Sequence, residues 1–495
     1  MIYSLLLLAA FGPADLDHAR GMALARAGRW PEAEAAFLRG QREAPRDKRF
    51  PVELAGVAFK RRDFDASRRH IRRALVLDPG DSYSNDFAGT LALLDGNIEA
   101  ALQYWNRIGK PRLERIRLEP EPGIDPVLLD RAFSFAPAST LALEDYRVTR
   151  ARLALLDAFP VWTLALEPRA DGDAFDAVLR TVQTRSWLAA LRGLPFATVY
   201  PEFRLPGRGV IRVRSLLRWD SQKRRAGLAL SGPLARRPAW HWRLFADGRN
   251  ENWALPGDSG FNMKRAEAGG EIETVTNSRL RWSAGASVAH RRFTNSSFAP
   301  GSSLAAHTAA SVALLRLPER RLSVEADGRT ELGRFFGRGL YSRPQGSLLA
   351  RWFPRARGDD YETSAQFRAG AATGRVPFDE LFMLGIERDN GLWLRAHAGT
   401  AGGRKGSAPL GPRFALANWE LAKIVRQGAL YSVRFGPFFD TGRVWGAPGA
   451  RFGYAGWMFD AGLQAELRFP GLARIVFTWG KDLRTGRNVW YATPR

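Results

Sequence analysis

The sequence predicts a multidomain protein with an α-helical repeat region, one α+β module and a C-terminal antiparallel β-barrel that crosses a membrane. Three observations support this prediction. Residues 15–112 repeat a helical pattern, residues 113–184 mix strand and helix patterns, and residues 190–495 alternate apolar and polar side chains with a period of two. The chain has 495 residues and is 45% hydrophobic, which is enough for several domains with buried cores.

The first residues have the features of a secretory signal. A short apolar stretch runs from Ile2 to Ala10, and the small residues Gly12 and Ala14 follow it before a charged segment. We therefore expect residues 1–14 to be a signal peptide that is cleaved after Ala14. No later stretch reaches the roughly 18 uninterrupted apolar residues of a membrane-spanning helix, so we expect any membrane crossing to use strands.

Composition argues against several kinds of site and partner. The chain has no cysteine, which excludes disulfides, zinc-thiolate sites and thiol catalysis. Lys and Arg number 74 and Asp and Glu number 50, giving a formal charge of +24, but the basic residues are scattered without a long block. We therefore expect no nucleic-acid partner. The six histidines show no ligand spacing, so we expect no metal. No HExxH, P-loop or dinucleotide-binding glycine motif occurs, so we also expect no cofactor, catalytic residue or small-molecule substrate.

A 34-residue step organises residues 15–112. Large, small and proline positions recur in phase, with small residues where helices would cross and a proline after the second helix of a unit. The residues that carry the pattern are Gly28, Trp30, Ala33, Phe37, Pro45, Phe64, Ala74, Pro79, Gly96, Ala101 and Trp105. The pattern resembles tetratricopeptide repeats, in which each unit is a pair of antiparallel helices. This resemblance implies a concave surface that binds protein.

Residues 113–184 follow the order strand, helix, helix, strand, strand. Asp125 and Pro126 are residue types favoured at a helix N-cap and at the first helical position. We expect strands over 113–118, 161–167 and 175–183, and helices over 126–133 and 143–156. This order resembles a POTRA domain, the periplasmic module that precedes barrels of the BamA family.

The last region consists of alternating runs separated by turns. In residues 459–469, for example, apolar side chains alternate with Asp460, Gly462, Gln464, Glu466 and Arg468. With their flanks, such runs approach the roughly 9–11 residues that a tilted strand needs to cross a bilayer. A water-soluble β-sandwich would give the same alternation, but it would divide this length into separate domains, and no Pro- or Ser-rich linker separates the runs. A closed transmembrane barrel is therefore the favoured interpretation.

Two segments of this region carry a specific motif. Phe438-Phe439-Asp440-Thr441-Gly442 places an acid on the polar face of a predicted strand, and Leu394-Arg395-Ala396-His397 lies upstream, before a glycine-rich stretch. Together they resemble the hallmark of the BamA/TamA-type outer-membrane assembly superfamily. In that superfamily a long loop folds back into the barrel, and its hydrophobic-Arg-Gly-aromatic tip docks on a strand that carries Phe-x-Asp-x-Gly.

The match can be followed residue by residue. Phe438, Asp440 and Gly442 match the strand motif, and Leu394 and Arg395 match the loop motif. Ala396 stands where the superfamily has glycine, and His397 stands where it has an aromatic residue. The resemblance implies that Leu394, Arg395, His397, Phe438, Asp440 and Gly442 hold the loop to the barrel. From the residues alone, Arg395 and Asp440 could also be two independently solvated charges.

The resemblance covers residues 113–495 and implies a barrel of 16 strands in the outer membrane, with the N-terminal domains in the periplasm. It implies a non-enzymatic function in inserting or translocating proteins, with membrane lipid, client proteins and periplasmic proteins as partners. Barrels of this superfamily commonly end on an aromatic residue, whereas in this sequence Trp490 and Tyr491 are followed by four further residues, Ala492 to Arg495.

Two other functions stay open. One resembles the surface lipoprotein assembly modifiers, which also combine helical repeats with a barrel but lack a module between them. The other is a passive pore or a structural scaffold in which the repeats tether other envelope proteins.

Overall fold

A computed structural model describes residues 12–170, 174–182, 187–205, 210–255, 259–355, 357–358, 360–428, 430–446, 456–470 and 472–494. Residues 1–11 of the predicted signal peptide and residues 183–184 at the predicted end of the α+β module lie outside the described residues. The chain divides into two compact units. The first comprises Met1–Ile116, Ala136–Leu143 and Leu166–Ala177, and the second comprises Arg117–Phe135, Glu144–Ala165 and Val178–Arg495. The predicted domain boundaries stay predictions.

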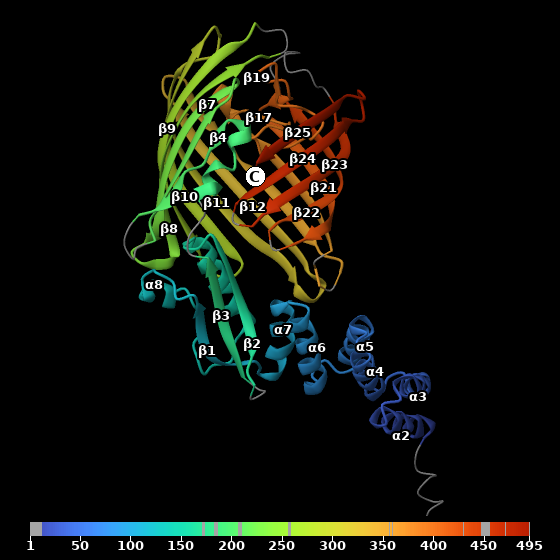
Figure 1. The fold of residues 1–495 in the computed structure, drawn as a ribbon. Helices are drawn as coiled ribbons and strands as arrows, with labels where there is room; N and C mark the ends of the chain where they lie inside the picture. Colours follow the sequence, from blue (N-terminus) through green and yellow to red (C-terminus); the bar gives the residue numbers. More distant parts are fainter. Residues whose placement is uncertain are drawn as a thin grey trace, which may run out of the picture. The chain divides into compact units, whose positions relative to one another are not determined.

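Consecutive helices make up most of the first unit (Figure 1). Their bounds are α2 (Pro13–Arg26), α3 (Trp30–Glu43), α4 (Arg49–Lys60), α5 (Phe64–Leu77), α6 (Ser82–Leu94) and α7 (Ile98–Trp105), with a short 3-10 helix η1 (Asn106–Ile108). Within the described part of the chain, no helix combines the length and the apolar composition that a membrane-spanning helix needs.

The 34-residue period corresponds to a left-handed turn between two helices. Gly28, Arg62 and Gly96 follow α2, α4 and α6, and their φ angles are 72°, 61° and 68°. Glycine adopts this conformation without steric cost, whereas Arg62 holds it at a cost of about 1–2 kcal/mol. After the second and third turns a side chain caps the next helix: the Asp63 carboxylate accepts a hydrogen bond from the Ala66 N–H at 2.9 Å, and the Asn97 side chain accepts one from the Ala100 N–H at 3.2 Å.

Five of the repeat residues lie in the core between these helices. Ala33, Phe37, Ala74, Ala101 and Trp105 are buried. Trp30 and Phe64 begin α3 and α5, whereas Pro45 and Pro79 are exposed and follow the ends of the same two helices. Close packing explains the small positions as well: a Cβ atom on Gly40 would lie 2.2 Å from the Phe50 ring.

A three-stranded sheet has the order β1-β3-β2. Its strands are β1 (Arg112–Glu119), β2 (Val161–Pro168) and β3 (Ala174–Val182), and the helices between them in sequence are α8 (Pro126–Asp130) and α9 (Leu143–Leu156). The predicted helix over 143–156 is confirmed, whereas the first helix ends at Asp130 instead of residue 133. The Asp125 side chain caps α8 by accepting a hydrogen bond from the Val127 N–H at 3.0 Å. Because β3 is central, β1 and β2 are the edges of this sheet.

The second unit contains a large antiparallel sheet whose strands follow one another around a barrel, with β25 next to β4 (Figure 1). The wall strands are β4 (Thr198–Val199), β5 (Glu202–Arg204), β6 (Arg212–Trp219), β7 (Lys223–Leu234), β8 (Arg237–Trp253), β9 (Phe261–Val275), β10 (Leu280–Thr294), β11 (Gly301–Leu317), β12 (Leu322–Phe335), β13 (Gly339–Ser342), β14 (Gln345–Trp352), β15 (Tyr361–Ala371), β16 (Thr373–Gly374), β21 (Arg413–Gln427), β22 (Ser432–Trp445), β23 (Met458–Phe469), β24 (Ala473–Asp482) and β25 (Asn488–Pro494). Short 3-10 helices, η2 (Trp187–Leu191), η3 (Leu194–Phe196) and η4 (Pro318–Arg320), lie among them.

Two wall positions are occupied by strands that are broken in two. β13 and β14 both pair with β12, and Arg343-Pro344 separates them; a proline removes a ladder hydrogen bond. β4 and β5 pair in the same way with β6. The count of 16 strands stays a prediction.

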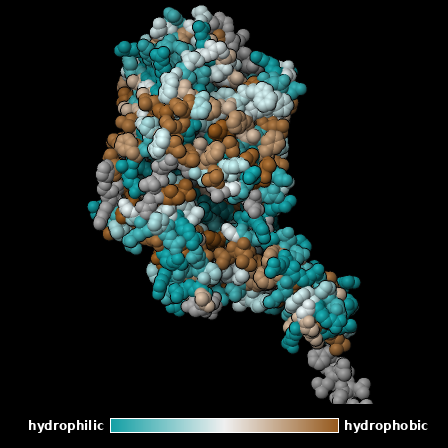
Figure 2. Space-filling model, viewed as in Figure 1, coloured by the Kyte–Doolittle hydropathy of each residue, from teal (hydrophilic) through white to brown (hydrophobic). Residues whose placement is uncertain are grey.

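The alternation in the sequence corresponds to two faces of the wall. Apolar side chains such as Trp282 and Val288 are 37% and 50% exposed, whereas the intervening polar residue Ser287 is buried. A water-soluble sandwich would bury the apolar face and expose the polar one. Hydrophobic residues gather on the middle of the visible face of the barrel, and hydrophilic residues gather above and below them (Figure 2).

Candidate functional site

The segment between β16 and β21, residues 375–412, is called the inserted loop. It contains η5 (Phe378–Glu380), β17 (Phe382–Met383), β18 (Thr400–Ala401), β19 (Arg404–Lys405) and β20 (Leu410–Gly411). Its apolar residues pack into two clusters with wall residues: Phe378 and Met383 lie with Trp253, and Leu384 and Leu394 lie with Phe414. The loop is therefore packed against β8 at one place and against β21 at another.

The tip of the inserted loop, Leu394–His397, lies against β22. The Arg395 Nη2 and Nε atoms donate to the Asp440 carboxylate at 2.7 Å and 2.9 Å, and the Arg395 backbone N–H donates to it at 3.0 Å. Both side chains are buried. This is the forked geometry in which a guanidinium binds a carboxylate most specifically.

Neighbouring strands complete the surroundings of Arg395. Its Nη1 atom donates to Glu420 of β21 at 3.0 Å and to Gln464 of β23 at 3.2 Å. The guanidinium carbon lies 3.9 Å from the centre of the Phe438 ring, a cation–π contact. Asn418 donates to Asp440 at 2.6 Å. The pair is therefore part of a network rather than two solvated charges.

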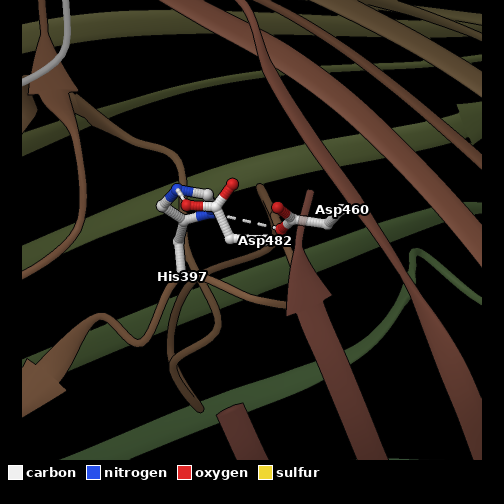
Figure 3. Close-up of side chains that lie close together, drawn as sticks. All are labelled: His397, Asp460 and Asp482. Atoms are coloured by element: carbon white, nitrogen blue, oxygen red, sulfur yellow. Dashed lines mark hydrogen bonds and ion pairs between the residues drawn. The ribbon is translucent and has the colours of Figure 1, made fainter. Parts of the chain in front are cut away.

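His397 lies close to two carboxylates other than Asp440, those of Asp460 and Asp482 (Figure 3). Its Nδ1 atom lies 3.1 Å from the Asp460 Oδ2 atom, and its Nε2 atom lies 3.7 Å from the Asp482 Oδ2 atom. The Ala396 N–H also donates to Asp460, at 2.7 Å. All three side chains are buried.

The carboxylates under the tip form a level row across the sheet. Asp440 of β22 is directly opposite Asp460 of β23, and Asp460 is directly opposite Asp482 of β24. We call these three residues the aspartate row. Like charges directly opposite each other on neighbouring strands destabilise a sheet, so the row depends on the basic side chains of the tip.

Glycines allow the tip to approach the wall closely. A Cβ atom on Gly480 of β24 would lie 2.6 Å from the Arg395 carbonyl oxygen and 3.0 Å from the Ala396 nitrogen. A Cβ atom on Gly442 would lie 3.1 Å from the Leu384 side chain. Backbone atoms cannot move aside as a flexible side chain can, so Gly480 has the stricter requirement.

The first part of the inserted loop carries an acidic pair, Asp379 and Glu380, against arginines of other strands. Arg291 of β10 lies 2.5 Å from Asp379 and 3.0 Å from Glu380, and Arg265 of β9 lies 2.6 Å and 2.8 Å from the same two acids. Arg249 of β8 is 3.2 Å from Asp379. Each buried acid of this pair therefore has at least two cationic partners.

Glu387-Arg388-Asp389 contacts the wall near the junction of β4 and β25. Asp389 lies 2.7 Å from Arg218 and 2.5 Å from Lys223. Arg388 donates to Asp220 at 2.8 Å and to the Thr198 hydroxyl of β4 at 3.3 Å. Arg388 thus contacts β4, the strand that lies next to β25 at this junction.

The six predicted loop and strand residues lie together: Leu394, Arg395 and His397 come from the tip, and Phe438, Asp440 and Gly442 come from β22. The prediction missed Asp460, Asp482, Glu420 and Gly480. One signal was present, because Phe459-Asp460-Ala461-Gly462 repeats the pattern of Phe439-Asp440-Thr441-Gly442. The spacing of the histidines does not reveal the cluster of His397 with Asp460 and Asp482, because these residues are far apart in sequence.

Comparison with known proteins gives matches in structure only. No protein-family model matches the sequence, and no curated protein matches it. CdiB from Escherichia coli matches with a TM-score of 0.51 and 11% identity, over 78% of this chain and 75% of that chain. BamA from Haemophilus ducreyi lacking POTRA domains 1–3 matches with a TM-score of 0.47 and 11% identity, over 78% and 84%. CdiB from Acinetobacter baumannii matches with a TM-score of 0.46 and 10% identity, over 77% and 73%. The chain therefore shares the fold of CdiB from Escherichia coli.

Proposed function

We propose that the protein is a non-enzymatic outer-membrane factor of the BamA/TamA-type superfamily that assembles or translocates proteins. The observation that carries this proposal is the docking of the Arg395 tip on Asp440 and Phe438 of β22. A motif match in sequence and a contact between the same residues in space are independent, since residues 45 positions apart need not meet. The shared fold with a bacterial barrel protein supports the proposal.

The surface of the barrel supports a place in the membrane. Exposed apolar side chains line the outer face of strands all round the wall, including Leu244 of β8, Leu304 of β11 and Phe477 of β24. Aromatic rings also approach one another along the wall: the rings of Trp240 on β8 and Trp282 on β10, which flank β9, are 5.8 Å apart. Such belts are typical of barrels in an outer membrane, where aromatic residues lie at the interfaces. We propose that the barrel spans the outer membrane and has 16 strands.

The N-terminal regions would deliver the client. We propose that α2 to α7 are tetratricopeptide repeats that recruit a client or a periplasmic partner protein. The β1-β3-β2 sheet would be a POTRA domain in the periplasm. Its edge strand β2 could take up an extended client segment by strand addition, whereas the edge strand β1 already bridges to Thr140 at Arg112. This mode suits client proteins that are themselves strands awaiting partners.

The inserted loop would control the barrel. Its acidic part is attached to β6–β10 and its basic tip to β21–β24, so it connects the two sides of the wall that meet at β4 and β25. We propose that it locks the barrel in a closed state until a client engages. Release would require breaking buried charge pairs, each of which is costly to leave half-satisfied.

Depletion of the protein from its native cell tests the function. We expect the abundance of several other outer-membrane proteins to fall, as measured by quantitative mass spectrometry of the outer-membrane fraction. Complementation with the wild-type gene should restore them, and the Arg395→Ala variant should restore them less well. An unchanged outer-membrane proteome after depletion would contradict the proposal.

Conductance in planar bilayers separates this function from a passive pore. We expect the wild-type barrel to show small, intermittent conductance, because the inserted loop fills part of the lumen. The Arg395→Ala variant should show larger and longer openings, whereas Arg404→Ala, which alters an exposed arginine of the same loop, should resemble wild type. A large and steady conductance in the wild-type protein would support the pore instead.

A further inference from the structure

We infer that His397, Asp460 and Asp482 form a binding site for one divalent transition-metal ion. The three side chains each offer a ligand atom, and these atoms all lie within 4.8 Å of one another (Figure 3). One imidazole nitrogen and two carboxylate oxygens are a ligand set that suits Zn²⁺ and related ions. This inference concerns the tip of the inserted loop and does not depend on what the barrel transports.

The first argument comes from charge. The buried carboxylates around the tip are Asp440, Asp460 and Asp482, and Arg395 pairs with Asp440. Asp460 and Asp482 are directly opposite each other and have only His397 within ion-pair distance among the described residues. Buried like charges need compensation, and a single divalent cation balances two carboxylates while leaving the imidazole neutral, which is the form that binds metal.

The second argument comes from an oxygen atom of Asp460. Its Oδ2 atom accepts hydrogen bonds from the Ala396 N–H and pairs with His397. Asp460 is 0% exposed, so water cannot reach its Oδ1 atom. This atom also accepts no hydrogen bond from the residues that the structure describes. A buried carboxylate oxygen normally has a partner, and a bound cation would provide one.

The third argument comes from the residues that support the site. The Asp482 carboxylate accepts hydrogen bonds from the Arg484 N–H at 2.9 Å and from the Thr485 hydroxyl at 2.5 Å. These contacts fix its orientation in the turn after β24, as outer partners fix a ligand in metal sites. The site would therefore join the loop tip to two wall strands, β23 and β24.

The test uses the full-length protein in detergent micelles, purified without a polyhistidine tag and stripped of metal with EDTA. Zn²⁺ is added by titration calorimetry, and retained metal is measured by mass spectrometry after gel filtration. We expect one Zn²⁺ per chain and a higher melting temperature with Zn²⁺ than with EDTA. The Asp460→Asn and Asp482→Asn variants should bind at least about tenfold more weakly.

Two further variants guard against misfolding and surface binding. His397→Phe has an aromatic side chain at the tip and should stay folded, as judged by circular dichroism, yet show no Zn²⁺-dependent shift in melting temperature. His290→Gln changes an exposed histidine of β10 and should bind Zn²⁺ like wild type. Mg²⁺ at the same concentration should leave the melting temperature unchanged, because one ligand is an imidazole.

Three results would overturn the inference. They are the absence of retained Zn²⁺ in wild type, equal binding by wild type and His397→Phe, and an equal shift with Mg²⁺. The first two would leave His397 and its two aspartates as an ion-pair network only, and the third would exclude a transition-metal site. None of these results bears on whether the protein assembles or translocates other proteins, which the depletion experiment tests separately.

Discussion

The two halves of the inserted loop are held by opposite charges. The first half presents Asp379, Glu380 and Asp389 to arginines and lysines of β6–β10. The second half presents Arg395 and His397 to carboxylates of β21–β24. In these contacts the charge of the loop residue is the reverse of the charge on the strands that it meets, although each half also has a contact outside this division: Arg388 with Asp220 in the first half and Lys405 with Glu251 of β8 in the second.

This difference specifies how the loop crosses the barrel. If the halves were exchanged, acids would face the aspartate row and cations would face the arginines, and buried like charges at short range are strongly unfavourable. The halves also differ in the ratio of acidic to basic side chains around them. Several arginines surround the acidic pair, whereas carboxylates outnumber the basic side chains at the tip. The tip is therefore the half that is more sensitive to losing a single cation.

Removing the Arg395 guanidinium should have the largest effect on stability. We expect Arg395→Ala to lower the free energy of unfolding by about 3–5 kcal/mol, because Asp440 would stay buried without its partner. The measurement is chemical unfolding in detergent micelles, followed by tryptophan fluorescence. Arg404→Ala, in an exposed part of the same loop, should change stability by less than about 0.5 kcal/mol. Equal effects of the two variants would show that the tip pair has no special role.

The acidic pair should respond less strongly to a single change. We expect Asp379→Asn to cost about 2–3 kcal/mol, because Glu380 still pairs with both Arg265 and Arg291. A double variant with Arg291→Gln should cost less than the sum of the two single changes, since the two residues share a contact. Strict additivity in this double-mutant cycle would contradict the contact.

Close packing under the tip gives a test that changes no charge. We expect Gly480→Ala to cost about 1–3 kcal/mol and to increase cleavage of the inserted loop by added protease, because its Cβ atom would meet the Arg395 backbone. Gly328→Ala on β12 is the matched control, since a Cβ atom there meets nothing within 4 Å. If both substitutions are silent, the tip does not approach β24 closely.

Arg388 should give the smallest and most local effect. We expect Arg388→Ala to cost about 1 kcal/mol overall, because it loses hydrogen bonds that are partly open to solvent. Amide hydrogen exchange should rise in β4 and β25 while it stays unchanged in β10 and β11. A uniform rise over the whole barrel would show that Arg388 does not act at the junction of β4 and β25.

The sequence predicts the repeating elements well because each has a strong local signal. Gly28, Arg62 and Gly96 are one repeat apart, and each adopts the same left-handed turn. Asp125 and Pro126 open α8, and the helix 143–156 has the predicted bounds. The end of α8 was less well predicted, because helix ends depend on tertiary contacts as well as on residue type.

The candidate site is only half visible in the sequence. Arg395 and Asp440 belong to recognisable motifs, so their neighbourhood could be predicted before their contact was known. Asp482 joins them through the register of β23 and β24, and a shift of one residue would turn its side chain to the other face. Gly480 matters because of a backbone on another segment, which no pattern within β24 records.

The level arrangement of Asp440, Asp460 and Asp482 implies an order of events during folding. Arg395, Ala396 and His397 can bind these carboxylates together only after β22, β23 and β24 have reached their final alignment. The tip therefore docks after these three strands have paired in register. A barrel in which they were misaligned would leave the tip undocked and the inserted loop open to proteolysis.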